Sequence, residues 1–170
     1  KKNKLSQIEY HFSKNKKTNF IFDKPIYVNS NGKIHLNNKN YGFRNDKWPK
    51  FPPQSCISIK RKTMKKNLKK LFQKKFPLTT LDFRIAALSD IYRENTIFLN
   101  KELTYYFQHH ANESNKNFKI FNFNWFKRRL EGFKYYQIVN KKRLKTMDYF
   151  FTVISNFFLD CIYFYKNKKN

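Results

Sequence analysis

Residues 60–75, KRKTMKKNLKKLFQKK, carry nine cationic side chains and no acidic one. Four apolar side chains recur among them at the i, i+4, i+7 and i+8 spacing of an amphipathic helix: Met64, Leu68, Leu71 and Phe72. The pattern predicts a helix that Ser58 caps and that ends before Pro77, because proline cannot continue a helix. We expect its apolar stripe to lie in the core and its opposite face to be wholly basic.

The basic face of this predicted helix has the properties of an anion-binding surface. Lys62, Lys65, Lys66 and Lys69 are neighbours on it, and like charges at i, i+4 cost about 0.2–0.5 kcal/mol per pair when nothing neutralises them. A face that meets only water usually mixes both signs of charge. An uninterrupted series of Lys and Arg therefore indicates contact with phosphates.

Positive charge dominates the chain as a whole. Its 170 residues carry 37 Lys and Arg against 11 Asp and Glu, which gives a formal net charge of +26. Residues 80–115 are the exception, with three basic and five acidic side chains, so we expect this segment to face protein or solvent. Apolar residues at 40% and aromatic residues at 19% exclude a disordered basic tail, which would be poor in Phe and Tyr.

A second basic cluster lies in the C-terminal third of the chain, where aromatic residues alternate with the cations. Such rings either stack on unpaired RNA bases or form the core, and Trp125 and Tyr135 are our candidates for stacking. The predicted RNA-binding side chains of the two clusters are Lys60, Arg61, Lys62, Lys65, Lys66, Lys69, Lys70, Lys74, Lys75, Lys127, Arg128, Arg129, Lys141, Lys142, Arg143 and Lys145.

Helical patterns continue after the first basic segment. Thr79 and Asp82 have the spacing of a capping box and predict a second helix directly after them. Asn100 predicts the start of a third helix, and Asn122 predicts the start of a fourth, which Gly132 would end.

The C-terminal segment has the clearest periodicity of the chain. Seven side chains recur at alternating intervals of three and four residues, the heptad seam of a coiled coil: Leu144, Met147, Phe151, Ile154, Phe158, Cys161 and Tyr165. Phe150, Val153, Phe157 and Ile162 widen this seam, which favours a helix in the domain core over one that packs on a partner or a membrane. The apolar run over residues 149–165 is shorter than the about 20 residues of a bilayer span.

The N-terminal third has β-forming and irregular sequence. Residues 20–28 and 33–36 are rich in β-forming side chains, and the Asn29-Ser30-Asn31-Gly32 sequence between them predicts a hairpin. Residues 48–53, WPKFPP, predict an extended linker. Residues 1–17 hold six lysines and little apolar sequence, so we expect an arm that orders only on binding.

Together these patterns predict an α+β fold that is predominantly helical. An N-terminal basic arm and a short β-hairpin precede an irregular bundle of four to five helices. The predicted division is residues 1–55 for the arm, hairpin and Pro-containing linker, and residues 56–170 for the helical domain.

The residues that carry most enzyme chemistry are scarce. The acidic residues are few and dispersed, and three glycines are too few to build a phosphate-binding loop. The two cysteines and four histidines lack zinc-site spacing. We therefore expect no catalytic residue, no metal and no cofactor, with Cys161 as a small core residue and Cys56 as a free thiol.

The overall composition is biased toward amino acids with A/T-rich codons. Lys, Asn, Phe, Ile and Tyr make up 95 of the 170 residues, and Lys outnumbers Arg 30 to 7. With its basic ends and its lack of a catalytic motif, the chain resembles organelle-encoded ribosomal proteins, particularly the mitochondrial ones of protists.

This resemblance implies a structural constituent of a mitochondrial ribosome, on the matrix side, that binds ribosomal RNA and neighbouring ribosomal proteins and has no small-molecule substrate. One alternative is an accessory subunit of a mitochondrial respiratory-chain membrane complex, with residues 144–165 in or beside the membrane and the lysines facing anionic lipid. A regulator that binds free nucleic acid, or a protein of a mobile element, is another.

Overall fold

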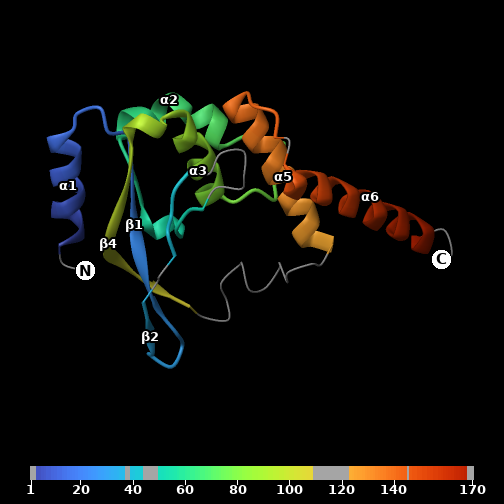
Figure 1. Ribbon diagram of the computed structural model, residues 1–170, viewed down its shortest axis with the longest axis horizontal. Helices are drawn as coiled ribbons and strands as arrows, with labels where there is room; N and C mark the ends of the chain where they lie inside the picture. The colour runs from blue at the N-terminus through green and yellow to red at the C-terminus, as the bar shows by residue number, and fades with distance from the viewer. Residues whose placement is uncertain (1–2, 37–38, 44–49, 109–122, 145, 168–170) are drawn as a thin grey trace.

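The computed structural model of the protein describes residues 3–36, 39–43, 50–108, 123–144 and 146–167, and it confirms a mixed α+β fold (Figure 1). The helices are α1 (Lys4–Lys14), α2 (Arg61–Leu71), α3 (Leu81–Ile91), α5 (Phe123–Asn140) and α6 (Met147–Asn167), with short 3-10 turns η1 (Gln54–Cys56) and η2 (Arg93–Asn95). The strands are β1 (Phe20–Val28), β2 (Ile34–His35), β3 (Ile57–Ile59) and β4 (Thr96–Phe107).

The first strand, β1, is the centre of the sheet because it pairs along both of its edges. β4 runs parallel to it along its whole length on one edge, while β2 and β3 run antiparallel to it and share the other edge. The predicted hairpin of β1 and β2 is confirmed. The N–H of Asn29 donates to the carbonyl oxygen of Lys33 at 3.0 Å, and Gly32 adopts a φ of +77° that glycine accommodates without strain.

The long strand β4 replaces the third predicted helix, so that prediction is wrong. Asn100 lies within a strand of 12 residues and caps nothing. Thr104, Tyr105, Tyr106 and Phe107 are β-branched or aromatic, and such side chains fit a pleated, half-buried surface. Pairing with β1 from end to end therefore outweighs the local spacing that resembled a helix.

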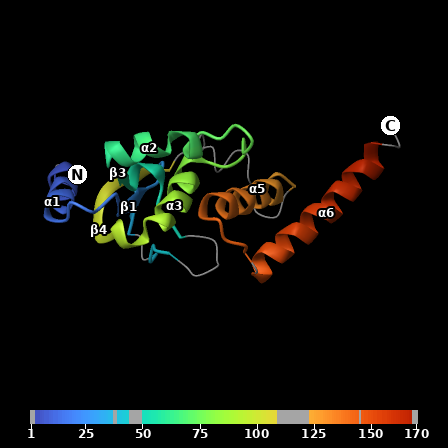
Figure 2. The ribbon, with the colours of Figure 1, turned by 90° about the horizontal axis from the view of Figure 1, so that it is seen from above.

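Helices cover both faces of the sheet (Figures 1 and 2). Successive side chains of a strand point to opposite faces, so Phe20 and Phe22 enter the large core with α2, α3 and α5, whereas Ile21 enters a smaller core with Ile8 of α1 and Leu103 of β4. The structure does not confirm the arm expected at residues 1–17. Most of that segment is α1, and the burial of Ile8 against the sheet holds it there.

Two predicted helix caps are wrong although both helices exist. Ser58 belongs to β3, and Lys60 is the residue that precedes α2. Thr79 donates its hydroxyl to Oε1 of Glu131 at 2.8 Å and does not cap α3, which begins at Leu81. Strand pairing with β1 places Ser58 in β3, and a contact with α5 takes the side chain of Thr79.

A buried guanidinium shapes the connection between α2 and α3. Arg84 of α3 donates to four backbone carbonyl oxygens of that connection, those of Leu71, Gln73, Phe76 and Thr79. Burial of a charge is costly unless hydrogen bonds replace its hydration. Arg84 therefore fixes the path of the chain through this connection.

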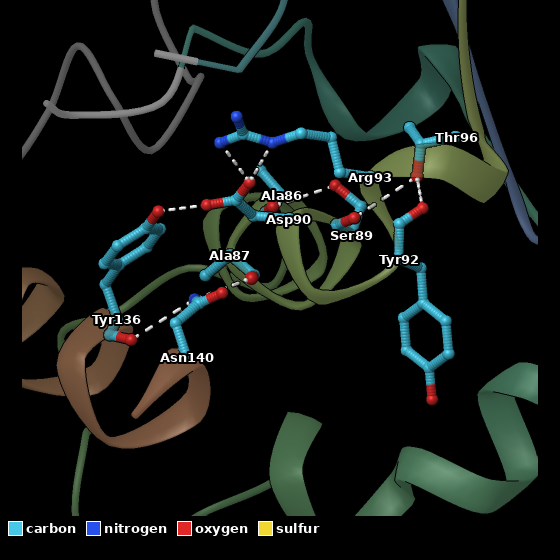
Figure 3. A network of polar contacts seen from close by, with 9 residues as sticks. All are labelled: Ala86, Ala87, Ser89, Asp90, Tyr92, Arg93, Thr96, Tyr136 and Asn140. Carbon is cyan, nitrogen blue, oxygen red and sulfur yellow. Dashed lines mark hydrogen bonds and ion pairs between the residues drawn. The ribbon is translucent and has the colours of Figure 1, made fainter. Parts of the chain in front are cut away.

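A polar network joins α3 to α5 (Figure 3). The buried carboxylate of Asp90 accepts hydrogen bonds from Nε of Arg93 at 2.9 Å and from the hydroxyl of Tyr136. Asn140, one turn after Tyr136 on α5, donates its amide to the carbonyl oxygen of Ala87 at 2.9 Å. These bonds orient α5 across α3, so the large core is closed by polar as well as apolar contacts.

The fourth predicted helix exists as α5 but runs past its expected end. Gly132 lies inside α5 and is buried, so the predicted stop is wrong. The side chains that follow it, Phe133, Tyr135, Tyr136 and Val139, are all buried in the large core. Their burial outweighs the about 1 kcal/mol that a glycine costs inside a helix.

The buried side of α2 is not the apolar stripe that its sequence predicts. Leu71 is buried, but the other two buried positions are Thr63 and Asn67. Leu68 and Phe72 are 43% and 54% exposed. The structure therefore confirms the helix and corrects its orientation.

The last helix, α6, also buries a different side from the one that its sequence pattern predicts. Its buried residues are polar, because Thr152 and Asn156 face α5 and the Asn156 amide donates to the carbonyl oxygen of Phe126 at 2.9 Å. The heptad positions within α6 point into solvent, with Phe158 60% exposed. Cys161 is exposed as well. The prediction that this helix lies in the domain core is therefore wrong.

The division expected after residue 55 does not separate two folding units. β1 lies before it, and β3 and β4, which pair with β1, lie after it. The helices that follow pack on this shared sheet and on one another. Among the residues that the structure describes, no helix combines the length and the hydropathy needed to cross a membrane.

Candidate nucleic-acid interface

The second helix presents a ridge of cations to solvent. Thr63, Asn67 and Leu71 lie on its buried side, and the exposed cations, which we call the α2 ridge, are Arg61, Lys62, Lys65, Lys66, Lys69 and Lys70. In the described part of the chain, no carboxylate lies within ion-pair distance of any of the six. At 1.5 Å per residue the ridge is about 14 Å long. It forms a continuous positive surface along three helical turns.

Polar contacts hold the α2 ridge in this orientation. The Thr63 hydroxyl donates to Oδ1 of Asn19, just before β1, at 2.7 Å. The Asn67 amide donates to the Thr63 carbonyl oxygen at 2.8 Å and to the hydroxyl of Tyr92 at 3.2 Å. Because Asn19 lies on the sheet side and Tyr92 at the end of α3, rotation of α2 would break the bonds to both of these partners.

The remaining predicted cations near α2 have separate roles. Lys60 is half-buried and donates its ammonium to the carbonyl oxygen of Lys16, which ties the start of α2 to the segment after α1. Lys74 and Lys75 follow the helix and are exposed, and the ammonium of Lys75 lies 5.2 Å from the ring centroid of Phe76. Lys74 and Lys75 therefore extend the ridge, whereas Lys60 acts as a link inside the molecule.

The second predicted cluster is divided by ion pairs. Arg129 pairs with Asp148, and Lys127 pairs with Asp160 at 3.7 Å, so two of the cations of α5 contact acids of α6. Sequence patterns miss these pairs because the acids lie far along the chain and show no helical spacing to the cations. Arg129 and Lys127 therefore join α5 to α6 in addition to any role at the surface.

Three exposed cations follow α5: Lys141, Lys142 and Arg143. The C-terminal half of α5, which these three cations follow, contacts α2. The Tyr135 hydroxyl donates there to the carbonyl oxygen of Lys70 at 3.1 Å (Figure 1). Lys145, also a predicted contact, lies outside the described residues.

The two stacking candidates differ in their accessibility. Tyr135 is fully buried, and burial raises its pKa well above the usual tyrosine value, so it is a core residue. Trp125 is half-buried beneath the guanidinium of Arg129, 5.1 Å from its ring. Trp125 also lines a shallow cavity of about 230 Å³ with Arg128 and Gly132. This volume is below the about 300–1,000 Å³ of small-molecule sites.

The carboxylate of Asp23, buried near the start of α1, has hydrogen-bond and ion-pair partners within the molecule. Asp23 in β1 accepts the Thr104 hydroxyl at 2.6 Å, and the Lys4 ammonium lies 3.0 Å from its other oxygen. Beside it, burial above all and then the Asp23 charge raise the pKa of the Cys56 thiol to about 11. A thiol that stays protonated at neutral pH is a poor nucleophile. Cys56 is a free thiol, as expected, but it is the buried cysteine, whereas Cys161, expected in the core, is exposed.

Among the described residues, no three side chains of His, Cys, Asp or Glu are grouped closely enough to hold a metal ion. Comparisons with models of protein families, with curated proteins and with solved structures found no match to this chain. The α2 ridge and the composition of the chain are therefore the features that bear on its function.

Proposed function

We propose that this protein is a structural constituent of a mitochondrial ribosome and that it binds ribosomal RNA through the α2 ridge. The observation that carries the proposal is the ridge itself, six exposed cations on one helix with no acidic partner in the described part of the chain. A net charge of +26 and the resemblance in composition to organelle-encoded ribosomal proteins support it. An electrostatic mechanism follows from these features.

Ammonium and guanidinium groups of the ridge bind phosphates and release the counterions that RNA holds in solution. The base edges of a double-stranded RNA helix lie in a deep, narrow groove that side chains cannot read, so phosphate and 2′-hydroxyl contacts place the protein. Leu68 and Phe72 are exposed on α2 beside Lys65 and Lys69, and they offer apolar contact to sugars. Lys74, Lys75 and the three cations after α5 would extend the contact.

The test replaces Lys62, Lys65, Lys66 and Lys69 with Gln and measures binding to a mixed-sequence RNA duplex over a series of NaCl concentrations. Each neutralised phosphate contributes about 0.7–0.9 to the slope of log K against log salt. We expect the fourfold variant to lower that slope by about 3 and to leave the circular dichroism spectrum unchanged, because all four side chains are exposed.

The matched control replaces four exposed lysines outside the ridge, Lys14, Lys33, Lys50 and Lys101, with Gln and removes the same charge. Equal weakening by both variants would mean that net charge, and not the ridge, sets affinity. In mitochondrial extracts we expect the native protein to sediment with ribosomal RNA and to leave it after nuclease treatment. Retention in membranes that only detergent releases, with no response to nuclease, would favour the respiratory-complex alternative and contradict the proposal.

A further inference from the structure

The outward side of α6 is the largest exposed apolar surface among the described residues. Six aromatic side chains of this helix are each 54–66% exposed: Phe150, Phe151, Phe157, Phe158, Phe164 and Tyr165. At roughly 200 Å² per aromatic side chain, they expose on the order of 700 Å². The largest apolar patch of a typical monomer is about 300–600 Å², whereas each partner of a stable protein complex buries about 800 Å². The area therefore matches one half of a protein interface.

This surface is organised for helix pairing. At 3.6 residues per turn, most of the heptad positions within α6 point away from Thr152 and Asn156, the residues that face α5. Phe151 lies at the edge of the seam, and its ring centroid is 6.1 Å from that of Phe126 in α5. A seam with this alternating spacing packs against another helix by inserting side chains between those of its partner. Both views show α6 extending away from the sheet and the other helices toward its C-terminal end (Figures 1 and 2). Among the described residues, α5 packs on the side of α6 opposite to most of the seam, which leaves the seam side for a second helix.

We propose that α6 pairs in antiparallel orientation with α6 of a second copy of this chain. The heptad positions Met147, Phe151, Ile154, Phe158, Cys161 and Tyr165 are symmetric about residue 156. A two-fold axis at this residue places Ile154 opposite Phe158 of the second copy, Phe151 opposite Cys161, and Met147 opposite Tyr165. Each seam residue then meets a seam residue, which is the condition that a self-complementary interface must satisfy.

The charges on and around α6 favour a second copy over an anionic lipid surface. Residues 149–165 contain no Lys or Arg, and their one acid, Asp160, would face the lipid charge. Asp160 and Asp148 already pair with cations of α5, so the paired seams bring no like charges together. Because each seam faces away from its own α5, the basic bodies of the two copies lie on opposite sides of the helix pair. This separation limits the repulsion between two chains of net charge +26.

Sedimentation equilibrium of the purified full-length chain in 0.5 M NaCl tests the pairing. We expect a concentration-dependent mass that approaches twice that of the monomer, and a monomer for the double variant Ile154→Glu, Phe158→Glu. The matched control, Ile34→Glu with Leu36→Glu, changes two exposed apolar side chains in and next to β2 and is expected to remain a dimer. A monomeric native chain at all concentrations, or a dimeric α6 variant, overturns the proposal.

Cysteine cross-linking tests the orientation. In the antiparallel pair, each Cys161 lies five residues from the two-fold axis, so the two are separated by about ten residues of 1.5 Å rise, or about 15 Å. That is too far for a disulfide, which needs Cα atoms within about 7 Å. Phe151→Cys places a new thiol opposite Cys161, so mild oxidation with copper phenanthroline should link this variant covalently and leave the native chain unlinked. Cys56 is buried and does not compete. Linkage of the native chain through Cys161 would indicate a parallel pair and contradict the proposed geometry.

One further outcome identifies a different occupant of the surface. If the native chain is a monomer that floats with phosphatidylserine-containing vesicles and the α6 variant does not, the occupant is lipid and the proposal is wrong. Salt separates this proposal from the function proposed above, because screening strengthens pairing between like-charged copies and weakens binding to RNA. Failure of one proposal therefore leaves the other testable.

Discussion

Arg84 is the residue on which the connection between α2 and α3 depends most. It donates to four carbonyl oxygens that belong to no regular element or to a helix end, and its guanidinium lies 5.5 Å from the ring centroid of Tyr135. Fixed donors at these positions allow an irregular segment to be buried, because a buried carbonyl without a partner is costly. Sequence periodicity places Arg84 inside a helix and contains no sign of these partners.

Replacement of Arg84 by Met should lower the free energy of unfolding by about 3 kcal/mol, since several buried carbonyls lose their donor at once. Urea denaturation followed by circular dichroism measures this change. Arg61→Met is the control, because Arg61 is exposed on α2 and its loss should alter stability by no more than about 0.5 kcal/mol. Equal effects of the two substitutions would show that the carbonyl cluster does not depend on Arg84.

At the scale of elements, α2 and α6 show the same departure from their sequence patterns. Each packs on its neighbours through a small polar pair at i, i+4, namely Thr63 with Asn67 and Thr152 with Asn156. Most of their large apolar side chains lie in solvent instead, although Leu71 of α2 is buried. The 3.6-residue period locates each helix correctly, because it reports local geometry. It does not report which side another element will cover, because that depends on residues distant in sequence.

The Asn156 amide is expected to control the docking of α6. It donates to the carbonyl oxygens of Phe126 and Thr152 at 2.9 Å and 2.8 Å. Asn156→Asp replaces these donors with a carboxylate that faces both oxygens, so we expect amide hydrogen exchange in α6 to accelerate at least about tenfold while α3 keeps its protection. Asn124→Asp, at an exposed position of α5, is the control. Unchanged exchange in α6 would mean that other contacts, such as the Arg129–Asp148 pair, hold the helix.

At the scale of the whole molecule, self-repulsion of a net charge of +26 opposes folding. The four ion pairs among the described residues offset little of it. Lys127 with Asp160, for example, is largely exposed and therefore weak. The large core and the docking of α1 on the far face of the sheet supply the compensating stability. The fold is thus expected to be sensitive to the ions around it.

Salt should therefore stabilise the protein. Between 0.05 and 0.5 M NaCl we expect the midpoint of thermal unfolding to rise by roughly 3–6 °C, which corresponds to about 1–2 kcal/mol for a chain of this size. The measurement uses the Ile154→Glu, Phe158→Glu variant, so that pairing of α6 does not contribute. The variant with four lysines outside the ridge replaced by Gln should show a smaller rise. A midpoint that falls with salt would indicate that attractive ion pairs outweigh self-repulsion.

Local chemistry in the sequence was enough to predict the hairpin, because the Asn29–Gly32 turn and the strands beside it are neighbours in the chain. It was also enough to predict α2, α3 and the density of positive charge on α2. Tertiary structure alone decided that residues 96–107 form a strand against β1, that Lys127 and Arg129 are ion-paired, and that α2 and α6 turn small polar side chains inward. These side chains are Thr63 and Asn67 on α2 and Thr152 and Asn156 on α6. The physical reason is that strand pairing, burial and ion pairing join residues far apart in the chain, and a local period carries no information about such partners.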